Sequence, residues 1–176
     1  ADRIGIRGHD AVAVFGCGPI GLGNILLLDF YGARPIGIDV APARLKLAEQ
    51  LGAVATVNPK QDDVIARLRE LTAGEGPDVC YECAGRPETV AMAFEACRCA
   101  GKIGIVGEQP EASFNPSRDL IHKELTVFGA WYWRRSEFFE MARLVREGLD
   151  VKRLISHELP LEQAQTGYDL MASGES

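Results

Sequence analysis

The chain has 176 residues, of which 47% are hydrophobic and 25% are charged, a composition typical of one globular domain. Its formal net charge of -6 argues against nucleic acid as the main partner, because phosphate binding needs a basic face. The longest apolar run, near residues 25–28, is far too short to span a membrane, and no signal-peptide pattern precedes it. We therefore expect a domain that binds neither nucleic acid nor a membrane.

Short apolar runs alternate with helical stretches along the chain. Ala11–Phe15 is a continuous apolar run, which is typical of a strand buried on both faces. The other strands are predicted over Pro35–Val40, Ala55–Val57, Asp78–Cys83, Lys102–Gly107 and Glu124–Ala130. Helices are predicted over Ile20–Tyr31, from Pro42 to a stop at Gly52, and over Gln61–Ala73, Pro87–Arg98 and Ser136–Arg146. One more strand and one more helix are predicted over Leu154–Leu159 and Glu162–Ala172.

This alternation predicts an α/β fold with a doubly wound, parallel, six-stranded sheet that carries helices on both faces. The expected strand order is 3-2-1-4-5-6, which places the strand 124–130 at an edge. Its apolar side chains alternate, so we expect protein to cover both of its faces. Because an edge strand without proline exposes unpaired backbone groups, we expect a homodimer through strand 124–130. The alternative is an edge shielded by the chain's own segment 155–176.

The strongest motif is a glycine turn between the first strand and the first helix. Its residues are Gly16, Cys17, Gly18, Pro19, Ile20 and Gly21, which match the G-x-G-x-x-G pattern of a Rossmann dinucleotide site. The first glycine permits the tight turn, the second lets backbone approach a pyrophosphate, and the third lets helix and strand pack closely. The start of the helix then offers free N–H groups to the phosphates.

An acid follows the glycine turn at the distance that a dinucleotide site requires. Asp39 ends the second predicted strand, 18 residues after Gly21, where its carboxylate can accept bonds from both ribose hydroxyls. A 2′-phosphate there would face a like charge, so Asp39 favours NAD over NADP. Its neighbour Val40 is also predicted to bind the cofactor. Capping of the next turn is the alternative role of this acid. Arg44 is either a ligand of the adenine or phosphates or a solvated helix arginine.

The ordered set of motifs resembles the coenzyme-binding domain of the medium-chain, zinc-type alcohol and polyol dehydrogenases. The resemblance covers residues from about 8 to 172 and rests on Asp10–Gly21, Leu51-Gly52-Ala53, Asp78-Val79, Glu82-Cys83-Ala84-Gly85, Gly101-Lys102, Gly104–Gly107, Lys123-Glu124-Leu125, Gly129-Ala130-Trp131, Gly148-Leu149 and Ile155-Ser156-His157. A second-strand acid after a glycine turn also occurs in methyltransferases, but the six-unit pattern and the glycine spacing favour a dinucleotide.

The resemblance implies further cofactor contacts at the ends of three later strands. Cys83 and Ala84 should border the adenosine side, and Val106 and Gly107 the nicotinamide riboside. The backbone of Ala130 and of Trp131 should hold the carboxamide. Ligands of doubly wound sheets do lie outside the carboxyl ends of the strands. For Trp131 and its two aromatic neighbours we expect simple aromatic packing, with a wall of the substrate pocket as the alternative.

The family's second domain, which carries the catalytic zinc, has no counterpart in the sequence. We therefore expect residues 1–176 to be an excised NAD-binding domain, with a core at about 8–150 and a segment 151–176 that leads back toward a catalytic domain. The five cysteines do not suggest a zinc site, since Cys80 and Cys83 point to opposite faces of one predicted strand. Their odd number is a poor disulfide framework, so we expect a reducing, cytoplasmic setting.

The sequence thus predicts no catalytic and no metal-ligating residue in this chain. Its predicted role is to bind and orient NAD for hydride transfer in a zinc-dependent dehydrogenase, whose substrate would be a small alcohol or polyol. The alternative is a non-catalytic NAD-binding or redox-sensing module. Zinc is expected only in the catalytic domain.

Overall fold

The computed structural model describes residues 4–173 and contains a six-stranded parallel sheet. The strands are β1 (Ala11–Phe15), β2 (Arg34–Ile38), β3 (Ala55–Val57), β4 (Val79–Glu82), β5 (Lys102–Ile105) and β6 (Thr126–Gly129). Their order is β3-β2-β1-β4-β5-β6, with every neighbouring pair parallel. The predicted fold class and strand order are therefore confirmed.

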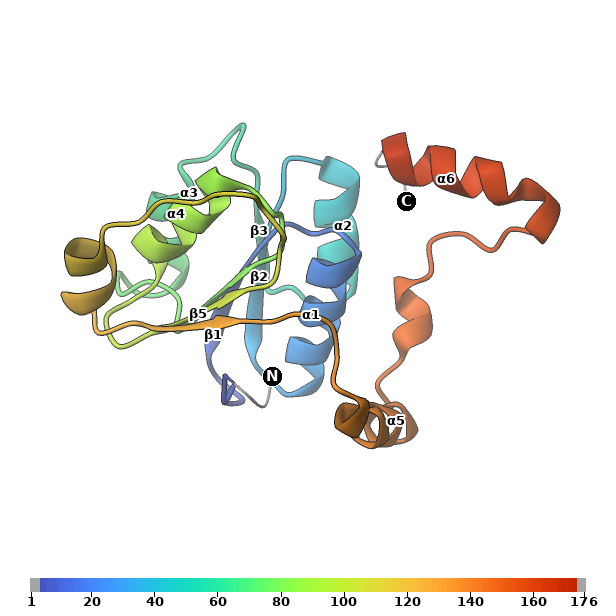
Figure 1. Ribbon diagram of the computed structural model, residues 1–176, viewed down its shortest axis with the longest axis horizontal. Helices are drawn as coiled ribbons and strands as arrows, with labels where there is room; N and C mark the ends of the chain where they lie inside the picture. Colours follow the sequence, from blue (N-terminus) through green and yellow to red (C-terminus); the bar gives the residue numbers. More distant parts are fainter. Residues whose placement is uncertain (1–3, 174–176) are drawn as a thin grey trace.

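Two hydrophobic cores lie on the two faces of the sheet, as the alternation of β1 side chains shows. Val12 and Val14 pack with α1 (Pro19–Phe30) and α2 (Pro42–Gln50), whereas Ala13 and Phe15 pack with α3 (Val64–Leu71) and α4 (Pro87–Ala96). Figure 1 shows the two helix pairs on opposite sides of the strands. Because β1 is buried on both faces, its sequence is a continuous apolar run rather than an alternating one.

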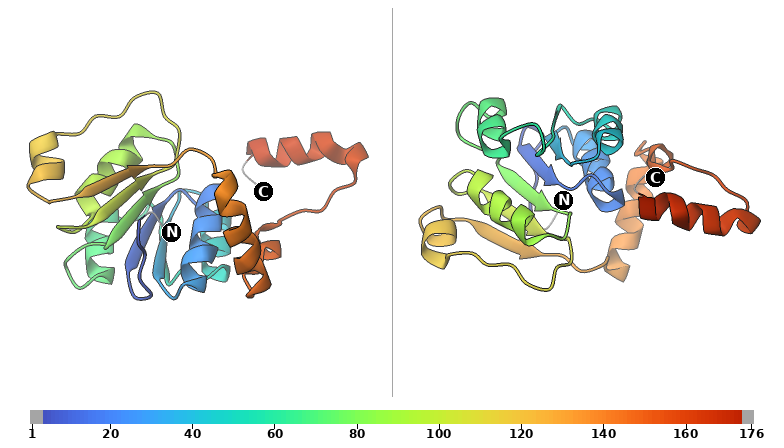
Figure 2. Two further views of the ribbon diagram at one scale, coloured as in Figure 1. Left: turned by 60° about the horizontal axis from the view of Figure 1, so that its bottom comes forward. Right: turned by 90° about the horizontal axis from the view of Figure 1, so that it is seen from above.

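The carboxyl-terminal part of the chain departs from the prediction. The helix predicted from residue 136 begins as the 3-10 turn Arg135–Glu137 and continues as α5 (Phe138–Arg146). The predicted strand 154–159 is wrong: a 3-10 turn over Val151–Leu154 leads into chain that pairs with none of the six strands. The last predicted helix is present as α6 (Ala164–Ser173), which stands away from the sheet in both views of Figure 2.

The edge strand β6 is less covered than its sequence suggests. It does lie at the end of the sheet, paired with β5 alone. Of the residues expected to share one covered face, Leu125 is buried, but Val127 is 38% exposed and Trp131 68% exposed. Phe128 on the opposite face is half-buried against the core of α1 and α2. The expectation that both faces are covered is therefore wrong, because the helices pack mainly on the more central strands.

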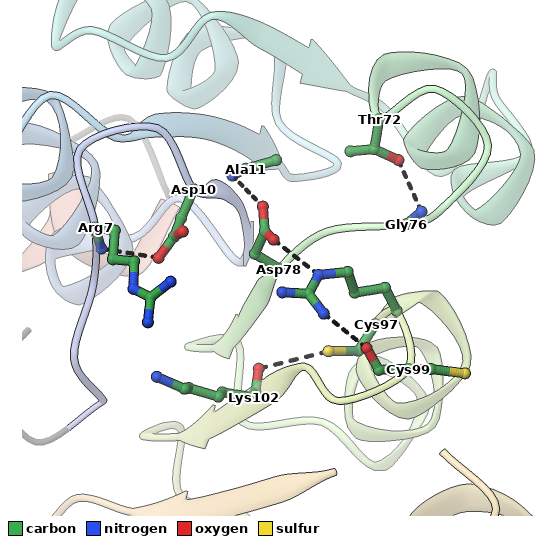
Figure 3. Close-up of polar contacts among 10 residues, drawn as sticks. Arg7, Asp10, Ala11, Thr72, Gly76, Asp78, Cys97, Cys99 and Lys102 are labelled. Atoms are coloured by element: carbon green, nitrogen blue, oxygen red, sulfur yellow. Dashed lines mark hydrogen bonds and ion pairs between the residues drawn. The ribbon is translucent and has the colours of Figure 1, made fainter. Parts of the chain in front are cut away.

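A polar network closes the amino-terminal ends of the central strands (Figure 3). One oxygen of Asp78 accepts the N–H of Ala11 at 2.8 Å and the other accepts Nε of Arg98 at 2.8 Å. Burial alone would raise the pKa of Asp78, but these hydrogen bonds outweigh burial and lower it. Arg98 also donates to the carbonyl of Cys99 at 2.7 Å, so the network ties β1, the start of β4 and the end of α4 together.

Candidate functional site

The glycine turn at the carboxyl end of β1 has the backbone shape that its sequence predicts. Gly16 has a φ of +94°, and a Cβ there would lie 2.8 Å from the backbone nitrogen of Ala84. A Cβ on Gly21 would lie 1.8 Å from the carbonyl oxygen of Gly16, so only glycine allows α1 to pack this closely on the turn. A Cβ on Gly18, by contrast, would meet no atom within 4 Å, so this backbone is open to a ligand.

The first turn of α1 is suited to an anion. The helix starts with Pro19, and Gly18 before it supplies no side-chain cap. The first turn contains no acidic residue either. The N–H groups at this end therefore face the glycine turn together with the positive end of the helix dipole.

Asp39 follows β2 directly and is 9% exposed. Its Oδ2 accepts the N–H of Cys17 at 2.8 Å, and its Oδ1 accepts the N–H of Ala41 at 2.8 Å. The carboxylate is thus held beside the glycine turn and also organises the start of α2, so both roles considered for this acid are compatible. Since each carboxylate oxygen has two acceptor positions, both remain able to accept a ribose hydroxyl.

Arg44 lies on α2 near the same acid. Its Nε is buried and has no hydrogen-bond partner, and its charge acts on the pKa of the Cys17 thiol in the glycine turn. A buried guanidinium nitrogen without a partner favours a ligand role over a solvated helix arginine. Val40, in contrast, is 49% exposed beside Asp39.

An open pocket of about 540 Å³ lies at the carboxyl ends of β1, β4, β5 and β6. Seven of the predicted cofactor-binding residues line it: Ile20, Cys83, Ala84, Val106, Gly107, Ala130 and Trp131. The other seven, on the glycine turn and around Asp39, lie outside its lining. Gly85, Glu108, Tyr132 and Trp133 also line the pocket but were not predicted as cofactor contacts.

Aromatic side chains form one rim of this pocket. Trp131 and Tyr132 contact each other edge to face, with ring centroids 4.7 Å apart. Trp131, Tyr132 and Trp133 are 68%, 81% and 55% exposed. Trp133 also lies against Phe138, so the three rings both line the mouth of the pocket and pack against aromatic neighbours, and the two roles considered for them are compatible.

Sequence reasoning missed one buried acid beneath the pocket. Glu82, the last residue of β4, is 0% exposed. Its Oε1 accepts the N–H groups of Ala84 and Gly85, each at 2.9 Å, and the hydroxyl of Thr89 at 2.7 Å. Its Oε2 has no hydrogen-bond partner. Only a charged residue inside a predicted buried strand could have signalled this position in the sequence.

The cysteines near the site are buried or half-buried thiols. Burial, followed by the charge of Asp39, raises the pKa of Cys17 to about 12. Burial also raises the pKa of Cys83 to about 12. Cys80 packs in the core of α3 and α4 and Cys83 against the core of α1 and α2, which confirms that they point to opposite faces. Within residues 4–173, no three His, Cys, Asp or Glu side chains are grouped to hold a metal ion.

The doubly wound sheet, the glycine turn and the acid after β2 together define a dinucleotide-binding domain. Residues 19–147 match the family model described as zinc-binding dehydrogenase. The chain belongs to this family, and it forms the NAD(P)-binding domain of a medium-chain zinc dehydrogenase.

Relatives of known sequence or structure agree with this assignment. The chain is 34% identical over 170 residues to an L-threonine 3-dehydrogenase of Caldanaerobacter subterraneus subsp. tengcongensis, covering 94% of this chain and 49% of that protein. It is 33% identical to the alcohol dehydrogenase TADH from Thermus sp. ATN1, with a TM-score of 0.91 over 99% of this chain and 51% of that one. The chain thus spans about half the length of the relatives it matches.

Two of the similar solved structures contain a nicotinamide dinucleotide, one of them NADP and the other NADH. A zinc-binding dehydrogenase from Sinorhizobium meliloti 1021, 30% identical with a TM-score of 0.80 over 88% of this chain and 47% of that one, is bound to NADP. An alcohol dehydrogenase from E. coli, with a TM-score of 0.88 over 97% of this chain and 51% of that one, is complexed with NADH but is 24% identical, so it shows the fold alone. Within residues 4–173, none of the helices combines the length and the apolar character that a membrane-spanning helix needs.

Proposed function

We propose that this chain binds NAD(H) and orients its nicotinamide for hydride transfer in a zinc-type dehydrogenase that acts on an alcohol or polyol. The observation that carries the proposal is the position of Asp39, which the N–H groups of Cys17 and Ala41 hold beside the glycine turn. Its relatives are named as dehydrogenases of L-threonine and of alcohols, which supports a hydroxyl-bearing substrate.

The residues of this chain suit the successive parts of the cofactor. Asp39 and Arg44 suit the adenosine ribose and its surroundings, and the open backbone at Gly18 suits the pyrophosphate. In the pocket, Cys83 and Ala84 suit the adenosine side. The part lined by Val106, Gly107, Ala130 and Trp131 suits the nicotinamide half, because it offers mostly apolar groups and backbone. When bound, the cofactor supplies the hydride acceptor. The protein contributes binding, orientation and exclusion of water from one side of the ring.

The proposed preference is for NAD over NADP. A 2′-phosphate placed beside Asp39 would bring like charges together, at a cost of several kcal/mol for a separation of about 4 Å at an effective dielectric near 20. A relative is bound to NADP, so the proposed preference is argued from Asp39 of this chain and not from the family.

Calorimetric titration with NADH and NADPH tests the cofactor proposal. We expect NADH to bind more tightly, and Asp39→Ala to narrow the difference between the two affinities. The variant Asp62→Ala is a matched control, because it removes another acid that accepts a backbone N–H, in this case that of Asn58. Equal or reversed affinities in the unaltered chain would overturn the preference, and absence of binding to either dinucleotide would overturn the function.

Zinc chemistry belongs, in this proposal, to the other half of the enzyme. The described residues bring no cluster of metal-ligating side chains together. We expect the purified chain to hold no stoichiometric zinc and to oxidise no alcohol alone. Elemental analysis that finds about one tightly held zinc per chain, or zinc-dependent NADH production by the pure chain, would contradict this.

We also infer that β6 joins two copies into a dimer. Thr126 donates its N–H to the carbonyl of Gly101, directly before β5, and Ala130 donates to Ile105 at the end of β5. The N–H of Val127, the residue after Thr126, therefore points to the free edge. Val127→Pro removes that outward donor and leaves the bonds to β5 in place. Light scattering should show a dimer for the native chain and a monomer for the variant. A folded variant that is still dimeric would exclude this edge as the interface.

A non-catalytic NAD-binding or redox-sensing module is the second candidate function. The exposed aromatic rim at Trp131 does not distinguish the two candidates. A zinc-ligand-bearing domain encoded upstream in the same gene would favour the enzyme. The five cysteines are all free, which supports a reducing, cytoplasmic setting for either protein.

A further inference from the structure

A buried charge lies directly behind the wall of the pocket. Glu82 is 0% exposed, and three donors converge on its Oε1, from Ala84, Gly85 and Thr89. No donor reaches its Oε2. Buried carboxylate oxygens are normally hydrogen-bonded, so an unpaired oxygen beside a binding site indicates a functional role.

The free oxygen is directed at the backbone that lines the pocket. A Cβ on Gly107 would lie 2.6 Å from Glu82 Oε2, so only glycine lets the pocket wall approach the carboxylate this closely. The backbone N–H groups of Val106 and Gly107 both donate to the carbonyl of Glu82 at 2.9 Å, which fixes this wall over the acid. Val106 and Gly107 line the same pocket as Ala130 and Trp131.

The charge of Glu82 acts on a side chain that lines the pocket. Cys83 lines the pocket, and burial followed by the Glu82 charge raises the pKa of its thiol. Little solvent screens an interaction that passes through a single layer of backbone, so the same charge acts on any charged group bound beyond that layer.

We propose that Glu82 is a positioning residue whose buried carboxylate favours the oxidised, positively charged nicotinamide over the neutral reduced ring in this pocket. This inference rests on the proposed function, because it requires the nicotinamide half of the cofactor to lie along Val106 and Gly107. NAD⁺ and NADH are otherwise alike in shape, so a charge behind the wall distinguishes them where packing alone does not.

The test is the ratio of the dissociation constants of NAD⁺ and NADH, measured by calorimetry for the native chain and for Glu82→Gln. We expect the ratio to rise about tenfold in the variant, the size of effect that one charge exerts at roughly 10 Å with an effective dielectric near 20. Two controls accompany it. Glu88→Gln removes an exposed charge from the first turn of α4, and Thr89→Val removes a donor to Oε1 but keeps the charge.

The outcomes separate the inference from the function beneath it. A ratio that changes only in Glu82→Gln supports the inference, whereas an equal loss of both affinities in Glu82→Gln and Thr89→Val shows a purely structural role and overturns it. Binding of neither dinucleotide by the native chain overturns the proposed function and the inference together. Binding of both with an unchanged ratio in a folded Glu82→Gln overturns the inference alone.

A second measurement covers the case in which Glu82→Gln does not fold. The native chain, labelled with ¹³C at glutamate carboxylates, is compared by infrared difference spectroscopy in its NAD⁺ and NADH complexes. We expect one carboxylate band to shift between the complexes, and the same shift in the Glu88→Gln control. Identical carboxylate bands in the two complexes would overturn the inference.

Discussion

The two ends of the parallel sheet are built in opposite ways. At the amino-terminal end, Asp78 uses both of its oxygens, and Arg98 spans from it to a backbone carbonyl (Figure 3). At the carboxyl-terminal end, glycines bring backbone against backbone, and buried polar atoms are left without partners. Within residues 4–173 these atoms are Arg44 Nε, Glu82 Oε2 and Gln109 Oε1, on the segments that follow β2, end β4 and follow β5.

This contrast separates stability from binding within one sheet. Satisfied polar groups at the amino end hold the strands together, because each hydrogen bond there replaces one to water and leaves no donor or acceptor unpaired. Unsatisfied groups at the carboxyl end lower stability and remain available to a ligand. Substitutions of polar side chains should therefore lower mainly stability at the amino end and mainly dinucleotide affinity at the carboxyl end.

The largest effect is expected from Gly21→Ala, because its Cβ would lie 1.8 Å from the carbonyl oxygen of Gly16. The variant should lose about 2–3 kcal/mol of unfolding free energy through overpacking. Gly18→Ala meets no atom within 4 Å, so it should keep its stability and lose only dinucleotide affinity. Urea unfolding and NADH titration of both variants make the comparison. Equal stability of the two would contradict the packing argument for Gly21.

Asp78→Asn should behave oppositely to Gly18→Ala, with lower stability and unchanged dinucleotide affinity. Loss of the charge-assisted bond to Arg98 should lower the unfolding free energy by about 1–2 kcal/mol, a value reduced by the partial exposure of the pair. NADH affinity should not change, since the network lies at the far end of the sheet from the pocket. A variant of normal stability that binds NADH weakly would show that the two ends are not separable.

Arg44→Met removes a guanidinium whose Nε has no partner in the chain. Stability should not fall, whereas affinity for NADH should fall about tenfold, as expected for one charge-assisted hydrogen bond. Lys46→Met on the same helix is the control, because Lys46 is exposed. If Arg44→Met lowers the melting temperature and leaves NADH affinity intact, the guanidinium belongs to the stabilising class.

The smallest effect concerns acid. The folded-state pKa of Asp78 lies below its ordinary value of 3.8, so its stabilising contribution is present above that value and is lost as the pH falls through the folded-state pKa. The difference in melting temperature between the native chain and Asp78→Asn should therefore be full at neutral pH and shrink below about pH 4. Thermal unfolding at several pH values measures it. A difference that grows in acid would reverse the assigned direction.

The glycine turn shows how much of the site is readable from sequence. Gly16 and Gly21 are required by backbone contacts that any such turn makes, so the motif predicts both their positions and their packing. Asp39 was predictable for the same reason, because the end of β2 lies beside that turn in every doubly wound sheet. The fitting of these residues to NAD stays a prediction until the titrations are made.

The segments at the periphery were harder to predict. Residues 154–159 have the side-chain pattern of a strand but pair with no other strand. Val127 does lie in a strand, but its side chain stays partly exposed. Local patterns report what a segment prefers, whereas pairing and cover depend on which other segments are present.

The sequence by itself determined the order of the elements, the two-faced sheet and the glycine turn with its acid, because these depend on hydrophobic periodicity and on the backbone freedom of glycine. Only the tertiary structure decided that Glu82 lies beneath the pocket with one oxygen free, and that Arg44 Nε is buried without a partner. Whether a buried polar atom finds a hydrogen-bond partner depends on residues that are distant in sequence, and a local sequence pattern does not predict which of them lie nearby.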